Sequence, residues 1–206
     1  MRINVPLLLI GLTLVAYWGR VVRMAWKVKR RTGNAGNFVP PEPLGRALRV
    51  VWVPAVAVWI SHPLVNAVVA TARLPAALRA VVPVAPAVAW AAAAAVVACA
   101  AATVVCWRRM GKSWRMGINP GERTELVATG AYARVAHPIY ALSIAMAAAT
   151  MIAMPSPLML IVGVVHIGLM TWEAAREERH LLALHGDAYR EYRSRVGRFL
   201  PRVGRR

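Results

Sequence analysis

Long apolar runs are the feature that most constrains this chain. Between residues 50 and 107 the only charged side chains are Arg73 and Arg79, and no acidic residue occurs there. A water-soluble domain would need a charged surface throughout, whereas an apolar run of about twenty residues can span the hydrocarbon core of a bilayer as a helix. With 59% hydrophobic residues in a chain of 206, the sequence predicts an all-α, polytopic membrane protein.

About five membrane-spanning helices are expected. Three long runs cover roughly residues 4–26, 48–70 and 84–107, and two shorter stretches, residues 138–154 and 158–172, form a helical hairpin. From Glu173 to about Val196 the sequence is charged, which predicts a cytoplasmic C-terminal amphipathic helix. We expect an N-terminal three-span region (residues 1–107) and a region that carries the functional site (residues 108–206), joined in one integrated domain.

The first apolar run has the length of a secretory signal peptide. However, its basic cluster follows the run instead of preceding it, which is the reverse of a signal's polarity. We therefore expect a retained first span, with cleavage as the alternative.

The net charge of +18 has two candidate meanings, nucleic-acid binding or contact with anionic lipid. Basic residues concentrate in residues 20–49, 108–134 and 176–206, between or after the apolar runs, and no nucleic-acid motif is found. The positive-inside rule places these three segments in the cytoplasm and the N-terminus outside. We expect an integral protein of a bacterial inner (cytoplasmic) membrane, with its active site facing the cytoplasm and no nucleic-acid partner.

The two cysteines, Cys99 and Cys106, lie seven residues apart in one apolar run. Buried cysteines commonly act as small hydrophobic side chains. Because no metal-ligand spacing involves them, no metal site is expected.

Polar residues cluster where the loop before residue 138 enters an apolar stretch. His137 and Pro138 stand at this boundary, Tyr140 follows one turn later, and Gly130 and Tyr132 precede them. Ionisable residues are costly near lipid, so such a cluster indicates function. A helix beginning at Pro138 is favourable, and its N-terminal N–H groups favour anions. A second His-Pro pair, His62-Pro63, lies inside an apolar run and is interpreted as structural.

Glu177 and Glu178 form the second half of the candidate site. They follow an apolar span directly, and Glu173 lies one turn earlier. Adjacent acids usually mark only a solvated helix face, but the predicted hairpin returns these residues to the membrane face that carries His137. A carboxylate there could bind the hydroxyl or amino groups of a nucleotide-like cofactor.

The ordered set resembles the isoprenylcysteine carboxyl methyltransferase and phospholipid methyltransferase family, in its bacterial type of integral membrane enzyme. The residues that carry the resemblance are Gly130, Tyr132, His137, Pro138 and Tyr140, then Glu177, Glu178, Leu181, Gly186, Tyr189 and Tyr192. Gly111-Lys112-Ser113-Trp114-Arg115 is similar to a G-x-S-W loop of the family, and Arg195-Val196 with Pro201 to its ending. One departure is Ala136, which stands where the family pattern has arginine, although Arg134 is close by.

The resemblance implies a pocket for S-adenosyl-L-methionine and methyl transfer to a lipophilic acceptor. The implied cofactor-binding residues are Gly130, Tyr132, His137, Pro138, Tyr140, Glu177 and Glu178. An isoprenylcysteine-like carboxylate acceptor would be oriented by Arg134 or Arg195. A phospholipid amine must lose a proton, which needs a base such as Glu178 or Glu177. The sequence leaves both acceptors open, and it leaves the oligomeric state open.

Three alternatives remain at this point. A sterol-reductase-like membrane oxidoreductase would use NADPH, and a degenerate family member would act as a non-catalytic scaffold. A transporter fits less well, because the ionisable residues lie at one face and not along a path through the bilayer midplane.

Overall fold

The computed structural model describes residues 3–32, 43–111, 114 and 125–202. These residues form six α-helices: α1 (Val5–Thr32), α2 (Pro43–Val68), α3 (Pro86–Met110), α4 (Pro138–Ala153), α5 (Pro157–His185) and α6 (Asp187–Arg195). Three short 3₁₀ helices stand between them: η1 (Thr71–Arg73), η2 (Ala76–Leu78) and η4 (Gly130–Ala133). The predicted all-α, polytopic membrane fold is confirmed.

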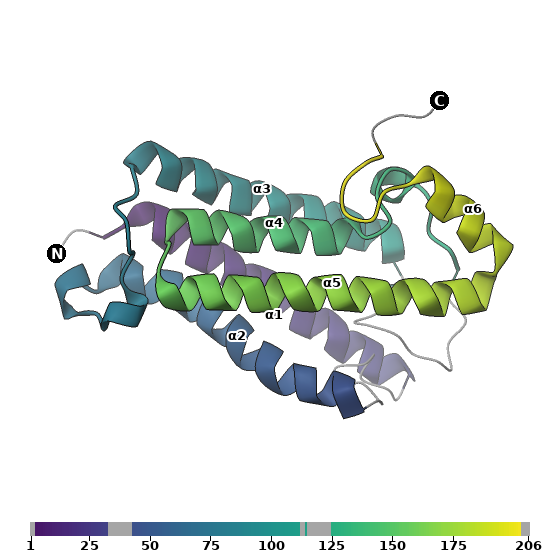
Figure 1. Ribbon diagram of the computed structural model, residues 1–206, viewed down its shortest axis with the longest axis horizontal. Coiled ribbons are helices and arrows are strands. Elements are labelled where there is room, and N and C mark those ends of the chain that lie inside the picture. Colours follow the sequence, from purple (N-terminus) through teal and green to yellow (C-terminus); the bar gives the residue numbers. More distant parts are fainter. Residues whose placement is uncertain (1–2, 33–42, 112–113, 115–124, 203–206) are drawn as a thin grey trace.

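Four helices, α1, α2, α3 and α5, are long and apolar enough to cross a membrane by length and composition. The fifth predicted span, α4, has only 16 residues, so it is about 24 Å long. The five helices lie side by side, and their ends gather in two groups (Figure 1). One group holds the basic last turns of α1 and α3, the start of α4 and helix α6; the other holds η1, η2 and the turn between α4 and α5. We call the first group the basic end.

The C-terminal helix differs from the prediction. Instead of one separate helix over residues 173–196, α5 runs without a break from Pro157 to His185, and α6 follows it. No proline or glycine interrupts the sequence between Gly168 and His185, so the membrane helix continues into the charged region. Gly186 then ends it with a positive φ of 53°, a conformation that glycine adopts easily. Glu177 and Glu178 therefore lie on the same rigid helix as the apolar span.

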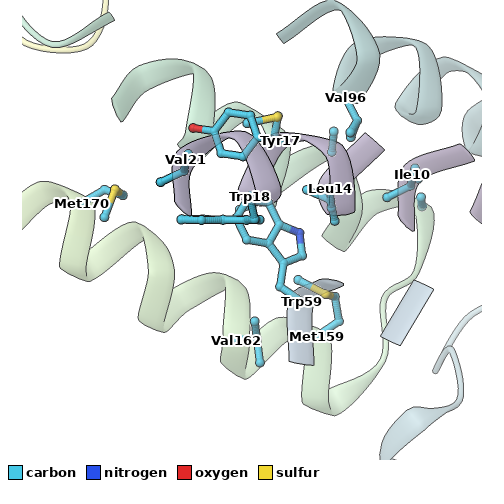
Figure 2. Packing of buried hydrophobic residues seen from close by; sticks show 14 of the residues in the cluster. Ile10, Leu14, Tyr17, Trp18, Val21, Trp59, Val96, Met159, Val162 and Met170 are labelled. Carbon is cyan, nitrogen blue, oxygen red and sulfur yellow. The ribbon is translucent and has the colours of Figure 1, made fainter. Parts of the chain in front are cut away.

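A stripe of side chains on α1 forms the centre of the core. Its members recur every three or four residues, as expected for one face of a helix, and are Ile10, Leu14, Tyr17, Trp18 and Val21. Figure 2 shows this stripe beside Trp59 of α2 and Met159 and Val162 of α5. The Trp59 indole N–H donates a hydrogen bond to the Thr150 hydroxyl of α4, at 3.1 Å. Paired polar groups of this kind hold helices together where lipid supplies no hydrophobic drive.

His62 has the structural role predicted for it. Its side chain is buried, and its Nε2 lies 3.1 Å from the carbonyl oxygen of Leu78 in η2. Pro63 follows inside α2. Cys99 and Cys106 are free thiols, and Cys106 is buried in the helix bundle.

Candidate active site

A cavity of about 170 Å³ opens at the basic end of the bundle. On this scale a single water needs roughly 10–15 Å³, so the space is large enough for a ligand. Its wall includes residues of α1, α2, α3, α4, α5 and α6. Along α5 it extends from Leu181 to Met170, which is roughly 16 Å at the rise of an α-helix. The cavity thus runs from the polar loops toward the interior of the helix bundle.

The backbone at His137 is fixed by the segment that follows α6. Val135 and Gly197 form an isolated parallel bridge. The Ala136 N–H donates to the carbonyl of Gly197 at 2.8 Å, and the His137 N–H donates to that of Arg198 at 3.1 Å. We call residues 196–202 the C-terminal strap. The strap holds His137 in place at the start of α4.

The His137 side chain lies between two carboxylates. Its Nδ1 is 3.5 Å from Glu177 Oε2, and its Nε2 is 3.3 Å from Glu178 Oε1. Its ring is stacked on that of Tyr140, with ring centroids 5.5 Å apart. Burial alone lowers the pKa of His137, but hydrogen bonds to Glu177 and Glu178 and their negative charges raise it above its ordinary value. The site therefore favours the imidazolium form.

The two adjacent glutamates have different surroundings. Glu177 lines the cavity and is hydrogen-bonded to the hydroxyl of Tyr140. Glu178 does not line the cavity among the described residues. Its Oε1 lies 3.1 Å from Arg193 Nη2. Its two carboxylate oxygens also accept hydrogen bonds from the Arg198 guanidinium, at 3.0 and 2.5 Å. The hydrogen bond to Glu178 raises the pKa of Arg198. Glu178 thus anchors the C-terminal strap to α5.

The structure brings part of the predicted site together. Lining the cavity are Tyr132, His137, Pro138, Tyr140 and Glu177, and with them Leu181, Tyr189 and Tyr192 of the second motif. Tyr192 also donates a hydrogen bond to the carbonyl of Tyr132, at 2.7 Å.

Other predicted residues lie elsewhere. Gly130 begins η4 with a φ of 65° and forms a turn, and it does not line the cavity. Arg134 and Arg195 are exposed, and Arg195 pairs with Glu191 at 3.5 Å. In the G-x-S-W loop, Trp114 lines the cavity, whereas Lys112, Ser113 and Arg115 lie outside the described residues.

The sequence reasoning missed the contribution of the N-terminal helices. Tyr17 and Trp18 of α1 and Arg49 and Trp52 of α2 line the same cavity. Arg49 forms an ion pair with Glu173, Nη2 to Oε1 at 3.1 Å. A signal was present, because Arg49 stands at the edge of an apolar run, where an ionisable residue indicates function.

The cavity offers polar donors that no described part of the chain satisfies. The indole N–H of Trp18, Nε of Arg49 and the hydroxyl of Tyr189 are buried without a hydrogen-bond partner among the described residues, and all three side chains line the cavity. Buried polar groups are seldom left unpaired in folded proteins. The donors therefore fit a ligand that carries hydrogen-bond acceptors.

The walls are also rich in aromatic rings, which attract cations through the negative face of the ring. They belong to Tyr17, Trp18, Trp52, Trp107, Trp114, Tyr132, Tyr140, Tyr189 and Tyr192. A positively charged sulfonium or ammonium group suits such a lining. Within the described ranges, no group of three or more His, Cys, Asp or Glu side chains could hold a metal ion.

Comparison with known proteins identifies the family. The sequence model of the phospholipid methyltransferase family matches residues 87–188, from the start of α3 to the start of α6. No curated protein and no solved structure matches the chain. The match favours a methyltransferase over the reductase and the non-catalytic scaffold. The chain belongs to the phospholipid methyltransferase family and is a membrane enzyme that uses S-adenosylmethionine.

Proposed function

We propose that the protein transfers a methyl group from S-adenosylmethionine to the amine of a membrane phospholipid at the cytoplasmic face. The observation that carries this proposal is that one cavity joins the motif residues at the basic end to aromatic walls deeper in the bundle. A soluble methyl donor can enter from the loop side, and a lipid can remain in the bilayer. The concentration of basic side chains at this end supports the cytoplasmic orientation.

The loop end of the cavity suits the donor. In our proposal Glu177 accepts hydrogen bonds from its amino or hydroxyl groups, and the unpaired hydroxyl of Tyr189 donates to one of its acceptors. Tyr132, His137, Pro138 and Tyr140 shape this end of the wall. When bound, the cofactor supplies an electrophilic methyl group on a sulfonium. The chain contributes mainly by aligning donor and acceptor, which can provide much of the rate.

The wall supports an amine acceptor over an isoprenylcysteine-like carboxylate. Besides its aromatic rings, the cavity is lined by the acids Glu125 and Glu177, which favour a cation. The arginines expected to orient a carboxylate, Arg134 and Arg195, are exposed and do not line it.

The amine must lose its proton before it attacks, and two acids were predicted as the base. Of these, Glu177 reaches the cavity, so we propose it for this role as well. In this proposal Glu178 acts indirectly, through its contacts with His137 and Arg198.

The cavity has a guanidinium group although Ala136 replaces the arginine of the family pattern. Ala136 itself lines the wall, and Arg49 reaches the same cavity from α2.

Because both halves of the chain build this wall, we also propose that residues 1–107 and 108–206 work as one integrated domain.

Binding of S-adenosylmethionine to detergent-purified protein, measured by calorimetry with NADPH as the control ligand, is the first test. We expect saturable binding of S-adenosylmethionine and none of NADPH. Methyl transfer is then measured with radiolabelled donor and vesicles of phosphatidylethanolamine, with phosphatidylcholine vesicles as the control that has no amine left to methylate. Binding of NADPH alone, or label on a carboxylate acceptor and none on phosphatidylethanolamine, would overturn the proposal.

A further inference from the structure

Among the described residues outside the matched family region, one cation lines the cavity, Arg49. We propose that Arg49 binds the phosphate of the acceptor's headgroup and thereby selects phospholipid amines over other membrane amines. This inference rests on the proposed function and names a residue that sets its specificity.

The guanidinium of Arg49 is held in a defined position. Nη2 contacts Glu173 Oε1 at 3.1 Å, and the guanidinium carbon lies 4.6 Å from the centroid of the Trp52 ring. The side chain is only 13% exposed. Its Nε is buried without a hydrogen-bond partner among the described residues. One edge of the guanidinium is therefore fixed by the protein, while an adjacent N–H is left for a ligand.

The local charge favours an anion. Glu173 is shared, since its Oε2 contacts Arg176 Nη2 at 3.1 Å while its Oε1 contacts Arg49. One carboxylate thus stands between two guanidinium groups. Glu177, the next acid along α5, is engaged by His137 and Tyr140. A positive excess in a largely buried place is costly, and an anionic ligand group would offset that cost.

Arg49 lies near the end of α2 at which we expect the lipid headgroups. It lies six residues into α2 from the basic end, roughly 9 Å along the helix. It also lines a small groove between α2 and α5, with Gly45, Leu48 and Leu169 among the other lining residues. The next residues on α2, Val50 and Val51, are 74% and 53% exposed, as expected for a surface that faces lipid.

This placement agrees with the order of groups in a phospholipid. The phosphate stands between the acyl tails and the amine, and Arg49 stands between the lipid-facing surface of α2 and the cavity that holds Glu177. A phosphate bound at Arg49 would direct the amine into the cavity. Since α2 lies outside residues 87–188, this selection would belong to the N-terminal helices of the chain and not to the matched region.

The test compares two acceptors that differ in the phosphate. Wild type, Arg49→Gln and Arg49→Lys are assayed in vesicles that contain either phosphatidylethanolamine or a long-chain alkylamine. For wild type we expect kcat/KM to favour phosphatidylethanolamine. In Arg49→Gln this preference should fall on the order of 10- to 100-fold, as for the loss of a hydrogen bond to a charged group. Arg49→Lys, which keeps the charge but loses the forked donor, should give an intermediate value.

Arg46→Gln is the matched control, because Arg46 is exposed on the same helix one turn earlier, and it should leave the preference unchanged. Calorimetry with S-adenosylmethionine reports the donor site and the fold of each variant. Unchanged donor affinity with a reduced preference would support the proposal. An unchanged preference for phosphatidylethanolamine over the alkylamine would overturn the proposal. Equal losses of S-adenosylmethionine affinity in Arg49→Gln and Arg49→Lys would also overturn it, because they would assign Arg49 to the carboxylate of the donor.

Binding of a short-chain phosphatidylethanolamine by calorimetry separates this inference from the proposed function. Wild type that binds the probe through Arg49 without methylating it would contradict the proposed function and support the phosphate site. If wild type methylates phosphatidylethanolamine and the rate does not depend on Arg49, the proposed function is supported and the phosphate site is contradicted.

Discussion

Glu177 and Glu178 show how one residue step on a helix separates two roles. A step of one residue turns the side chain by about 100°, so Glu177 lies in the cavity wall and Glu178 lies among the arginines of α6 and the C-terminal strap.

Glutamine at these positions should therefore have unequal effects. Replacing both, Glu177→Gln with Glu178→Gln, should abolish S-adenosylmethionine binding. Of the single variants, Glu177→Gln should account for a loss of affinity on the order of 10- to 100-fold, because it removes a charged acceptor from the wall. Glu178→Gln should mainly lower thermal stability, since Arg193 and Arg198 lose their carboxylate. Calorimetry and thermal melts measure both effects, with the exposed Glu191→Gln as the control. Unchanged affinity in the double variant would remove Glu177 from the cofactor site.

The two His-Pro pairs provide a second comparison. His137→Ala should weaken S-adenosylmethionine binding by about tenfold or more, because it removes a wall residue that contacts Glu177. His62→Ala should leave the affinity near that of wild type, since His62 contacts Leu78 in η2 and does not line the cavity. Equal losses by calorimetry would mean that the motif around His137 is structural.

Protonation of His137 should also make stability depend on pH. Because the pKa of His137 is raised in the folded protein, its contribution is fully present below the unfolded value of about 6.5 and is lost as pH rises through the folded value. The melting temperature of wild type should thus fall over this range, and His137→Gln should flatten that part of the profile. A profile identical to wild type in the variant would contradict this assignment.

Among the elements, the C-terminal strap has the strictest steric requirement. A Cβ at Gly197 would lie 1.8 Å from the carbonyl oxygen of Leu200, so only glycine fits there. The same residue pairs with Val135 and accepts from the Ala136 N–H.

Gly197→Ala should therefore destabilise the protein by about 1–3 kcal/mol, as overpacking does, and should weaken S-adenosylmethionine binding through His137. Gly19→Ala is the matched control. A Cβ at Gly19 meets nothing within 4 Å, and alanine in a helix is favoured by roughly 0.5–1 kcal/mol over glycine. Thermal melts should shift in opposite directions, and a stable Gly197→Ala with normal binding would contradict the role of the strap.

At this scale most elements could be predicted from the sequence, because the length of an apolar run predicts the length of a membrane helix. It failed at the C-terminal helix, where the change from apolar to charged composition suggested a boundary near Glu173. Composition changes where the environment changes, but a helix ends only where its backbone is interrupted, which here is Gly186. The strap was also beyond prediction, since its pairing with Val135 depends on contacts between residues distant in the chain.

For the whole molecule, the basic end should lie in the cytoplasm. In a Cys99→Ala, Cys106→Ala background, Asp187→Cys and Arg73→Cys place exposed thiols at opposite ends of the bundle. A membrane-impermeant maleimide added to intact cells should label Arg73→Cys, whereas Asp187→Cys should react only after the membrane is opened. The reverse pattern would invert the topology.

The cavity itself could be predicted only in part. The motif residues His137 and Glu177 were recognisable because polar groups beside apolar spans are unusual. Tyr17, Trp18 and Trp52 carry no such signal, since aromatic residues in a membrane helix are ordinary core residues. Only the packing of α1 against α2 and α3, and of α2 against α5, places them in a cavity wall.

The shortness of α4 has a consequence for the bilayer around the enzyme. At about 24 Å this helix of 16 residues is shorter than a hydrocarbon core of about 30 Å. Only Ala145 and Ile152 of α4 are exposed, so lipid meets the helix along this narrow face, where the bilayer must thin to match it. A headgroup near His137 could then meet the donor without leaving its leaflet. Methylation should accordingly be fastest in thin membranes and slow down as the acyl chains lengthen, so the thickness of the membrane would itself regulate the enzyme.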